Sequence, residues 1–218
     1  MKNILRKILS KISLGRLALV FRESKLAHQY CLGKGIEIGG SAHNPFGLNT
    51  LNIDFFYSTE TCFKKEEKRL CGKSLPVDIV AAGDCLPLAD ESQEFVVSSH
   101  VIEHFANPIQ ALLEWDRVIK PTGILFMIVP HKNRTFDKDR ERTPLAHLID
   151  DFHNHATTPA AEDEHGHHHA WITEDFVELI NYMMSELKVA WSLLRVEDVD
   201  DKVGNGFTVI IKKLNNRE

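Results

Sequence analysis

The chain has 218 residues, a formal net charge of −5 and a composition that is 43% hydrophobic and 26% charged. These values predict a single soluble globular domain over residues 1–218, with a core large enough for stability. The acidic balance argues against a general nucleic-acid binder, because neutralising phosphates requires a basic surface. No apolar run approaches the roughly 18 residues of a membrane span.

The four cysteines show no C-x-x-C spacing; they are Cys31, Cys62, Cys71 and Cys85. A chain of this size without a secretion signal keeps such residues most simply as thiols in a reducing compartment. We therefore expect a cytoplasmic protein.

Residues 1–32 combine basic and apolar side chains with a helical period. The apolar side chains share one face of the expected helix; they are Ile4, Leu5, Ile8, Leu9 and Ile12. One interpretation is a peripheral contact with an anionic membrane surface or a partner protein. The other interpretation, which we favour, is a helix that packs against the rest of the domain.

From Gly35 onward, short apolar strands alternate with helical segments. The polar segment 57–72 is expected to be helical. Asn107–Pro108 is typical of a helix start, and that helix should stop at Pro121–Gly123. Thr173 is expected to cap a further helix that runs to about residue 186. The predicted strands are 35–39, 50–54, 77–81, 94–99, 124–129, 189–196 and 206–213.

The chain is organised around a glycine turn that follows the first strand. Glu37 lies near the end of this strand, and Gly39 and Gly40 allow the backbone to turn sharply and approach a ligand. A second carboxylate, Asp54, closes the next strand. In a doubly wound α/β sheet, ligands bind outside the carboxyl ends of the strands, where such an acid can accept hydrogen bonds from a ribose diol. The layout therefore predicts a nucleoside site.

Further motifs follow in a characteristic order and spacing. They are Asp84–Leu88, Glu94–His104, Asn107–Pro108, Glu114, Arg117–Gly123 and Ile124–Pro130. Together with Glu37–Gly40, this series resembles the class I S-adenosylmethionine-dependent methyltransferases, specifically the small-molecule group with an "LEH" turn after strand four. Ser41 stands where that pattern usually has a second glycine. The resemblance implies a seven-stranded, mostly parallel Rossmann-like sheet with an antiparallel last strand.

The resemblance also implies which residues would hold S-adenosylmethionine. Glu37 would orient the glycine loop, Asp54 would bind the ribose, and Asp84 with the backbone of Cys85 would hold the adenine edge. Ser99 and His100 would flank the methionine end. A structural alternative stays open for each, because Asp84 could be an ordinary turn residue and Glu37 could simply close a buried strand.

The segment 131–172 is long for a loop in a compact domain, which indicates a function. It is rich in histidine; these residues are His131, His147, His153, His155, His165, His167, His168 and His169. In the family that the chain resembles, the loops after strands four and five roof the methyl-transfer site, so we interpret this segment as an acceptor-binding cap. For the tract 165–169 we favour acceptor or loop contacts over a structural zinc site.

Methyl transfer to a hydroxyl requires positioning of the acceptor and removal of a proton, for which histidine is the natural base. His104, after strand four, and His131, after strand five, are the candidates. Either could instead be structural. His100, Glu103 and His104 would share one face if their turn is helical. Two imidazoles and a carboxylate suit a divalent metal, and ubiquinone-type O-methyltransferases resemble the chain at Glu103 and His104, which coordinate a metal there.

We therefore expect an S-adenosylmethionine-dependent methyltransferase, acting by O-methylation on a small-molecule or saccharide acceptor. The saccharide rests on the pattern from His131 to His147, which resembles that of bacterial methyltransferases associated with glycan assembly. The alternative is a methyltransferase fold that only binds or scaffolds a partner. A nicotinamide-dependent oxidoreductase is a distant third, and the sequence leaves the oligomeric state open.

Overall fold

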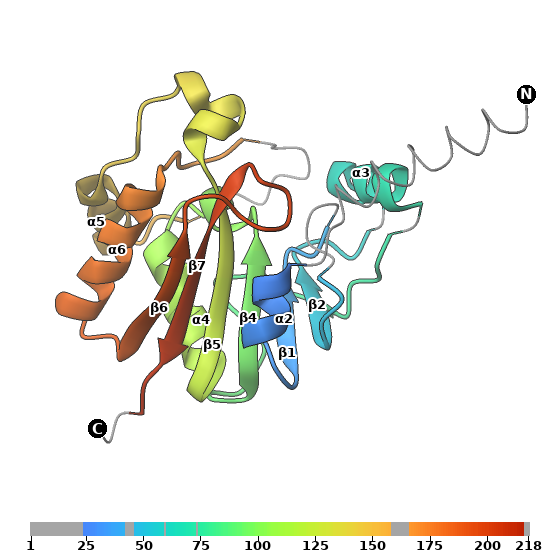
Figure 1. Cartoon of the computed structure of the whole chain (residues 1–218), viewed down its shortest axis with the longest axis horizontal. Coiled ribbons are helices and arrows are strands. Elements are labelled where there is room, and N and C mark those ends of the chain that lie inside the picture. Colours follow the sequence, from blue (N-terminus) through green and yellow to red (C-terminus); the bar gives the residue numbers. More distant parts are fainter. Residues whose placement is uncertain (1–23, 42–45, 59, 73, 158–165, 216–218) are drawn as a thin grey trace, which may run out of the picture.

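The computed structural model describes residues 24–41, 46–58, 60–72, 74–157 and 166–215. Seven strands form one sheet in the order β3-β2-β1-β4-β5-β7-β6 (Figure 1). The strands are β1 (Gly35–Ile38), β2 (Thr50–Asp54), β3 (Ile79–Val80), β4 (Gln93–Ser99), β5 (Ile119–Pro130), β6 (Trp191–Glu197) and β7 (Gly206–Lys213). Strands β1 to β5 run parallel, and β7 lies antiparallel between β5 and β6. The predicted doubly wound sheet with an antiparallel last strand is confirmed.

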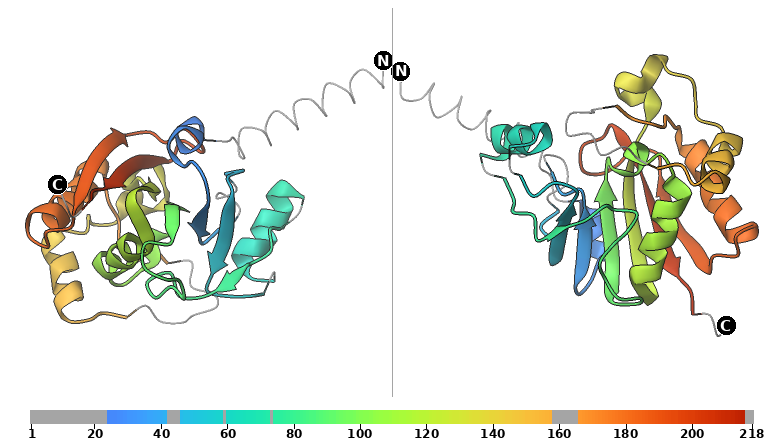
Figure 2. Two further views of the ribbon diagram at one scale, coloured as in Figure 1. Left: turned by 90° about the horizontal axis from the view of Figure 1, so that it is seen from below. Right: turned by 180° about the vertical axis from the view of Figure 1, so that it is seen from behind.

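Helices cover both faces of this sheet. They are α2 (Lys25–Tyr30), α3 (Cys62–Cys71), α4 (Pro108–Val118), α5 (Leu145–His153) and α6 (Thr173–Ser185), with short turns η1 (Ile102–His104), η2 (Lys132–Arg134) and η3 (Phe136–Asp139). Alternate residues of the strands point to opposite faces. On β5, Leu125 and Met127 join a core with α4 and α6, whereas Phe126 and Ile128 join a smaller core with α2. The view from behind in Figure 2 shows α4, α5 and α6 on the first face.

The start of α4 follows the prediction. The side chain of Asn107 accepts a hydrogen bond from the Gln110 amide (3.0 Å), and Pro108 is the first helical residue. The helix ends at Val118, however, before Pro121, because Ile119 already pairs with β4 as the first residue of β5.

Two other helix starts differ from the prediction. The side chain of Thr61 caps α3, so this helix begins five residues later than 57. Thr173 is the first residue of α6, and Ile172 takes the cap position that we predicted for Thr173. The carboxylate of Asp175 accepts the Ile172 amide hydrogen (3.0 Å), and the Thr173 hydroxyl donates to Asp198 instead (2.5 Å).

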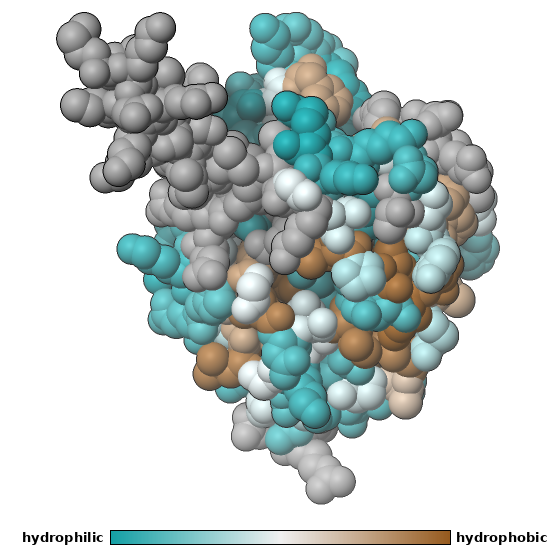
Figure 3. Space-filling model, turned by 90° about the vertical axis from the view of Figure 1, so that its right-hand side faces the viewer, coloured by the Kyte–Doolittle hydropathy of each residue, from teal (hydrophilic) through white to brown (hydrophobic). Residues whose placement is uncertain are grey.

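Strand β3 contains only Ile79–Val80, whereas the sequence predicted 77–81. Its start is displaced by a side chain, because the Asn52 amide donates to the carboxylate of Asp78 (2.8 Å) rather than to a strand carbonyl. Several large apolar side chains are exposed near this edge of the sheet, including Leu51, Phe55, Phe63 and Val80. Figure 3 shows apolar patches among polar residues on this side of the molecule.

The crossover from β1 to β2 contains no helix in its described residues, 39–41 and 46–49. Phe46 is fully buried there and packs edge-on against Phe126 (5.9 Å between ring centroids), so it occupies part of the face beside α2. This connection between β1 and β2 is short, because parallel strands are usually joined by a crossover of about a dozen or more residues that contains a helix.

The segment between β5 and α6 is structured in its described part. The turns η2 and η3 rise above the carboxyl end of β5 (Figure 1), and α5 follows. Among the described residues, no helix is long and apolar enough to cross a membrane. The amphipathic helix predicted within residues 1–32 lies mostly outside the described residues, as does His165.

Candidate active site

The glycine turn after β1 is shaped by its neighbours. Gly39 has a φ of +66°, and a Cβ there would lie 2.7 Å from Cγ2 of Val101. A Cβ at Gly40 would lie 2.2 Å from Oδ1 of Asn52. Both positions therefore require glycine, for conformation at Gly39 and for packing at both. From the sequence we attributed the two glycines to the approach of a ligand.

The turn is held from α3 by a buried cation. The ammonium group of Lys64 donates to the carbonyls of Gly40 (2.6 Å) and Leu75 (3.2 Å). It also pairs with the carboxylate of Glu67 at 3.0 Å, and both side chains are 1% exposed. The sequence by itself does not reveal this contact, because Lys64 is one of several lysines that look equivalent in a polar helix.

Glu37 lies inside β1 and is buried. Burial raises the pKa of its carboxyl group to about 8, although the nearby charges of Lys202 and Lys64 act in the opposite direction. One carboxylate oxygen lies 3.5 Å from the Thr50 hydroxyl. The side chain therefore carries a proton at neutral pH, which suits a hydrogen-bonding role better than that of a fixed negative charge.

Asp54 ends β2 at the carboxyl edge of the sheet, next to the glycine turn. The Gly39 amide donates to the carbonyl of Ile53 (2.7 Å), so the turn and the end of β2 are directly connected. The carboxylate of Asp54 accepts the amide hydrogen of Phe56 (3.2 Å), and burial raises its pKa.

The loop that carries Asp84 is fastened to α4. The indole of Trp115, which is fully buried, donates to the carbonyl of Gly83 (2.7 Å). The Leu86 amide donates to the carboxylate of Glu114 (2.6 Å). The Cys85 amide, which we expected to contact adenine, donates to the carbonyl of Ala82 within the loop (3.1 Å). Asp84 itself is partly exposed in a turn.

Ser99 and His100 stand where β4 ends. Ser99 is fully buried, and its hydroxyl oxygen has no hydrogen-bond partner among the described residues; the same holds for Ser41 in the glycine turn. His100 has a φ of +55°, and its amide donates to the carbonyl of Ile128 on β5 (2.9 Å). The two serine hydroxyls thus leave hydrogen-bonding capacity for a polar ligand at this edge.

Beyond β4, the turn η1 brings Glu103 and His104 together with the histidine-rich segment. Nε2 of His104 lies 3.7 Å from Oε1 of Glu103, and Nε2 of His167 lies 3.6 Å from the same oxygen. Asp137 from η3 contacts the other ring nitrogen of His167 at 2.5 Å. Burial lowers the pKa of His104 to about 4 and raises that of Glu103 to about 8.

This cluster differs from the ligand set that we predicted for a metal, and that set remains a prediction. The three groups with ligand atoms within 4.8 Å of one another are Glu103, His104 and His167, and His100 is not among them. The turn η1 is only three residues long and 3-10 in type, so the helical spacing assumed for His100 does not exist. His167 was missed because it is 63 residues away from His104 in the chain.

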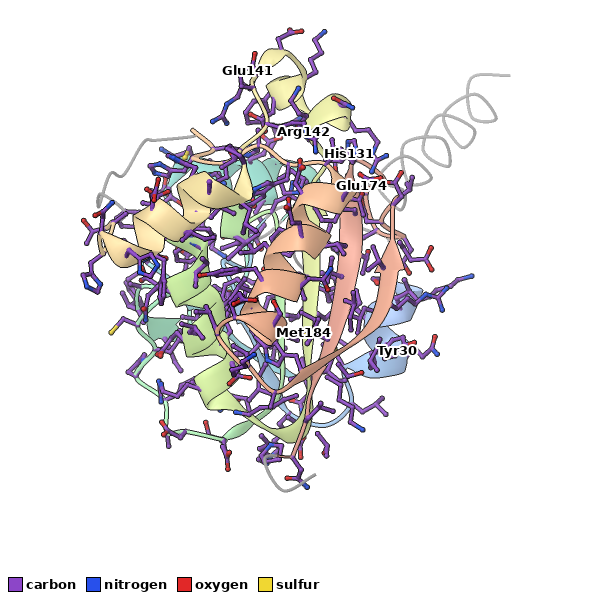
Figure 4. All side chains as sticks on the ribbon, turned by 90° about the vertical axis from the view of Figure 1, so that its left-hand side faces the viewer. Tyr30, His131, Glu141, Arg142, Glu174 and Met184 are labelled. Carbon is purple, nitrogen blue, oxygen red and sulfur yellow. The ribbon has the colours of Figure 1, made fainter. Side chains whose placement is uncertain are left out.

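His131 directly follows the last residue of β5, and both of its ring nitrogens face polar groups. Its Nδ1 accepts the amide hydrogen of Asn133 (3.2 Å), and its Nε2 lies 3.9 Å from the carboxylate of Asp198. Figure 4 shows His131 beside Glu174 at the start of α6. Burial lowers its pKa, with the Arg134 charge acting in the same direction.

The sheet order, the antiparallel β7 and the groups at the carboxyl edge define the fold of the class I S-adenosylmethionine-dependent methyltransferases. Residues 33–127 match the family described as a methyltransferase domain. The chain therefore has the methyltransferase fold, whereas membership of this family and of the "LEH" subgroup remains a prediction, because the match covers less than half of the chain.

Solved structures agree with this fold. An S-adenosylmethionine-dependent methyltransferase from Thermotoga maritima, described as a possible histamine N-methyltransferase, superimposes with a TM-score of 0.53 and 16% identity, covering 99% of this chain and 100% of that chain. A methyltransferase from Aquifex aeolicus has a TM-score of 0.52 and 16% identity, covering 95% and 98%. At these identities the likeness concerns the fold.

A curated relative is an uncharacterized 37.1 kDa protein in a Streptomyces fradiae transposon, 33% identical over 117 residues. The match covers 52% of this chain and 32% of the relative, so the chain spans about a third of that protein's length.

Proposed function

We propose that the protein is an S-adenosylmethionine-dependent methyltransferase that methylates a hydroxyl group of a small-molecule acceptor, with a saccharide as the acceptor class. The observation that supports cofactor binding is that neighbouring strands end at the same edge of the sheet. The Gly39 amide bonds to the end of β2 (2.7 Å), and the Ala81 amide, which leads to Asp84, bonds to the carbonyl of Asp54 (3.0 Å). The carboxyl ends of β1, β2 and β3, each followed by polar groups, thus lie side by side. Ligands bind at this edge in doubly wound sheets.

In this proposal, Asp54 accepts hydrogen bonds from the ribose, and Asp84 with its loop holds the adenine. Ser99, His100 and the glycine turn at Gly39 and Gly40 receive the methionine end. S-adenosylmethionine, when bound, supplies an activated methyl group attached to a sulfonium. The protein has to hold the acceptor oxygen in line with that group, exclude water and take up the hydroxyl proton.

Two arginines in the segment between β5 and α6 are already engaged in contacts within the protein. Arg140 donates to Asp137 (2.9 Å) and to the carbonyl of His168 (3.0 Å). Arg142 pairs with Asp175 at the start of α6 (2.9 Å). We therefore assign these arginines to holding the segment after β5 in place, and we assign acceptor contacts to the cluster around Glu103.

Of the two candidates for the base, His104 fits the acceptor side better than His131. His104 belongs to η1, directly beyond the carboxyl end of β4, and its imidazole is neutral at neutral pH because burial lowers its pKa to about 4. His131 caps η2 through Nδ1 and faces Asp198 with Nε2. Its role in this proposal is structural.

The test of the cofactor is calorimetric titration with S-adenosylhomocysteine. The Asp54→Asn variant should bind more weakly by about 1–3 kcal/mol, because a ribose hydroxyl loses a charged acceptor. Asp150→Asn, an exposed carboxylate on α5, is the matched control and should bind normally. An Asp54→Asn variant with unchanged affinity would contradict the assignment.

Turnover separates an enzyme from a scaffold. Release of S-adenosylhomocysteine should depend on an added acceptor when the protein is tested with a panel of sugars and phenols. Binding of the cofactor without turnover on any acceptor would favour the alternative of a non-catalytic binding protein.

A further inference from the structure

Glu103 is a buried carboxylate without a conventional partner. Its side chain is 0% exposed, and neither carboxylate oxygen has a hydrogen-bond partner among the described residues. Transfer of such a group from water is costly unless a proton, a hydrogen bond or a cation compensates it. The surroundings of Glu103 should therefore show how it is compensated.

Two imidazoles face this carboxylate, and their distances from it distinguish a direct hydrogen bond from a cation held between the three groups. The separations of 3.6 and 3.7 Å between Oε1 of Glu103 and Nε2 of His167 and His104 are too long for hydrogen bonds. Ligands of a tetrahedral zinc ion lie about 3.3–3.4 Å apart, because zinc–nitrogen distances are about 2.0–2.1 Å. The spacing thus fits a small cation between the three atoms better than a direct contact.

The remaining ring nitrogens are held by outer groups. Nδ1 of His104 lies 3.2 Å from the carbonyl of Gly166, and Nδ1 of His167 lies 2.5 Å from the carboxylate of Asp137. Arg140 in turn binds Asp137 at 2.9 Å. Metal-binding histidines typically donate their second ring N–H to a carboxylate or carbonyl, which directs the lone pair of Nε2 to the metal.

We propose that Glu103, His104 and His167 bind a divalent transition metal of the zinc class, with Asp137 and the Gly166 carbonyl as outer-shell partners. Three protein ligands leave a fourth position open. The geometry alone supports the metal site, and only the role of the metal in methyl transfer rests on the proposed function. There, a cation would lower the pKa of the acceptor hydroxyl, and His104 would act as a ligand instead of as the base.

A second cluster, formed by His147, Asp151 and His169, also has its ligand atoms within 4.8 Å of one another. His147 and Asp151 are one turn apart on α5 and 3.2 Å from each other, which is an ordinary contact between neighbouring side chains on a helix. The ring of His169 stacks on Trp171 (5.1 Å, 19°). This cluster has an explanation without a metal, so the observations favour the first.

The test is titration of the metal-stripped full chain with Zn²⁺ against a chromophoric competitor, and with Co²⁺ for its visible absorption. One equivalent should bind. Asp137→Asn should weaken binding by about 10- to 100-fold, as outer-shell changes do, and His104→Gln and His167→Gln should weaken it further. His153→Gln, an exposed histidine at the end of α5, is the control and should bind normally. Loss of the site in His147→Gln alone would overturn the assignment.

Stability provides a second readout that a purely structural role would not produce. Without metal, Glu103→Gln should unfold at the same or a higher temperature than the wild-type protein, because it removes a costly buried acid. With Zn²⁺, the wild-type protein should gain stability and Glu103→Gln should not. A destabilised Glu103→Gln variant with an unchanged Zn²⁺ effect would contradict the proposal. S-adenosylhomocysteine titration of the same variant tests the cofactor site separately.

Discussion

The ammonium group of Lys64, on α3, donates a hydrogen bond of 2.6 Å to the carbonyl of Gly40 in the turn after β1. Through this contact, and through its pair with Glu67, a helix outside the sheet determines the position of the turn that we assign to the cofactor.

Lys64→Met should therefore destabilise the protein by about 3–5 kcal/mol, because Glu67 keeps a buried charge without its partner. Affinity for S-adenosylhomocysteine should fall as well. Lys65→Met, at the next position on the exposed side of α3, should change neither quantity. Urea denaturation and calorimetric titration measure the two effects. A double variant, Lys64→Met with Glu67→Gln, should recover part of the stability but not the affinity.

Gly39 and Gly72 allow conformational strain to be separated from a steric clash. Both have positive φ, +66° and +75°, but a Cβ at Gly39 would lie 2.7 Å from Val101, whereas a Cβ at Gly72 would meet nothing within 4 Å. We expect Gly72→Ala to cost about 1 kcal/mol and Gly39→Ala clearly more. Denaturation of the two variants measures the difference, and equal losses would show that the Val101 contact is unimportant.

Trp115 and Trp191 offer a matched pair of indole hydrogen bonds. The first donates to the carbonyl of Gly83 in the Asp84 loop (2.7 Å), and the second donates to Asp116, the residue that follows Trp115 on α4 (2.6 Å). Trp→Phe at either position should cost about 1–3 kcal/mol of stability. Only Trp115→Phe should weaken S-adenosylhomocysteine binding. A loss of affinity in Trp191→Phe as well would indicate a general loosening rather than an effect on the loop.

The buried acid Glu37 should make stability depend on pH. Its pKa is about 8 in the folded protein and 4.5 ordinarily, so between these values the folded state holds a proton that the unfolded chain has lost. The free energy of unfolding should therefore decrease as pH rises, by up to about 1.4 kcal/mol per unit for this group. Histidines whose pKa is lowered in the folded protein change the free energy of unfolding below about pH 6.5. The slope between pH 6.5 and 8 therefore reports on the buried acids.

Glu37→Gln should flatten this decrease, and Glu103, which has the same sign, should account for what remains. Chemical denaturation at several pH values between 6.5 and 8, with a chelator present, measures the slope. The same slope in Glu37→Gln and wild-type protein would mean that the carboxyl group is already ionised at neutral pH.

The sequence alone determined the sheet and its carboxyl edge. Strands are set by local apolar patterns, and the start of α4 is set by a local cap at Asn107 and Pro108, so both were predictable from nearby residues. The positions of Gly39, Asp54 and Asp84 after successive strands follow from the same order. The ends of predicted elements shifted where a side chain such as Asp78 or Asp175 took a backbone partner, and α5 was not predicted.

The tertiary structure decided which distant groups meet. His167 reaches Glu103 only because the segment after β5 folds back over the turn after β4, and Lys64 reaches Gly40 only because α3 packs beside the β1 turn. Contacts of this kind depend on burial and on the path of the chain, which no local spacing encodes. Local patterns thus specified the scaffold, and packing between remote segments selected the side chains of the candidate site.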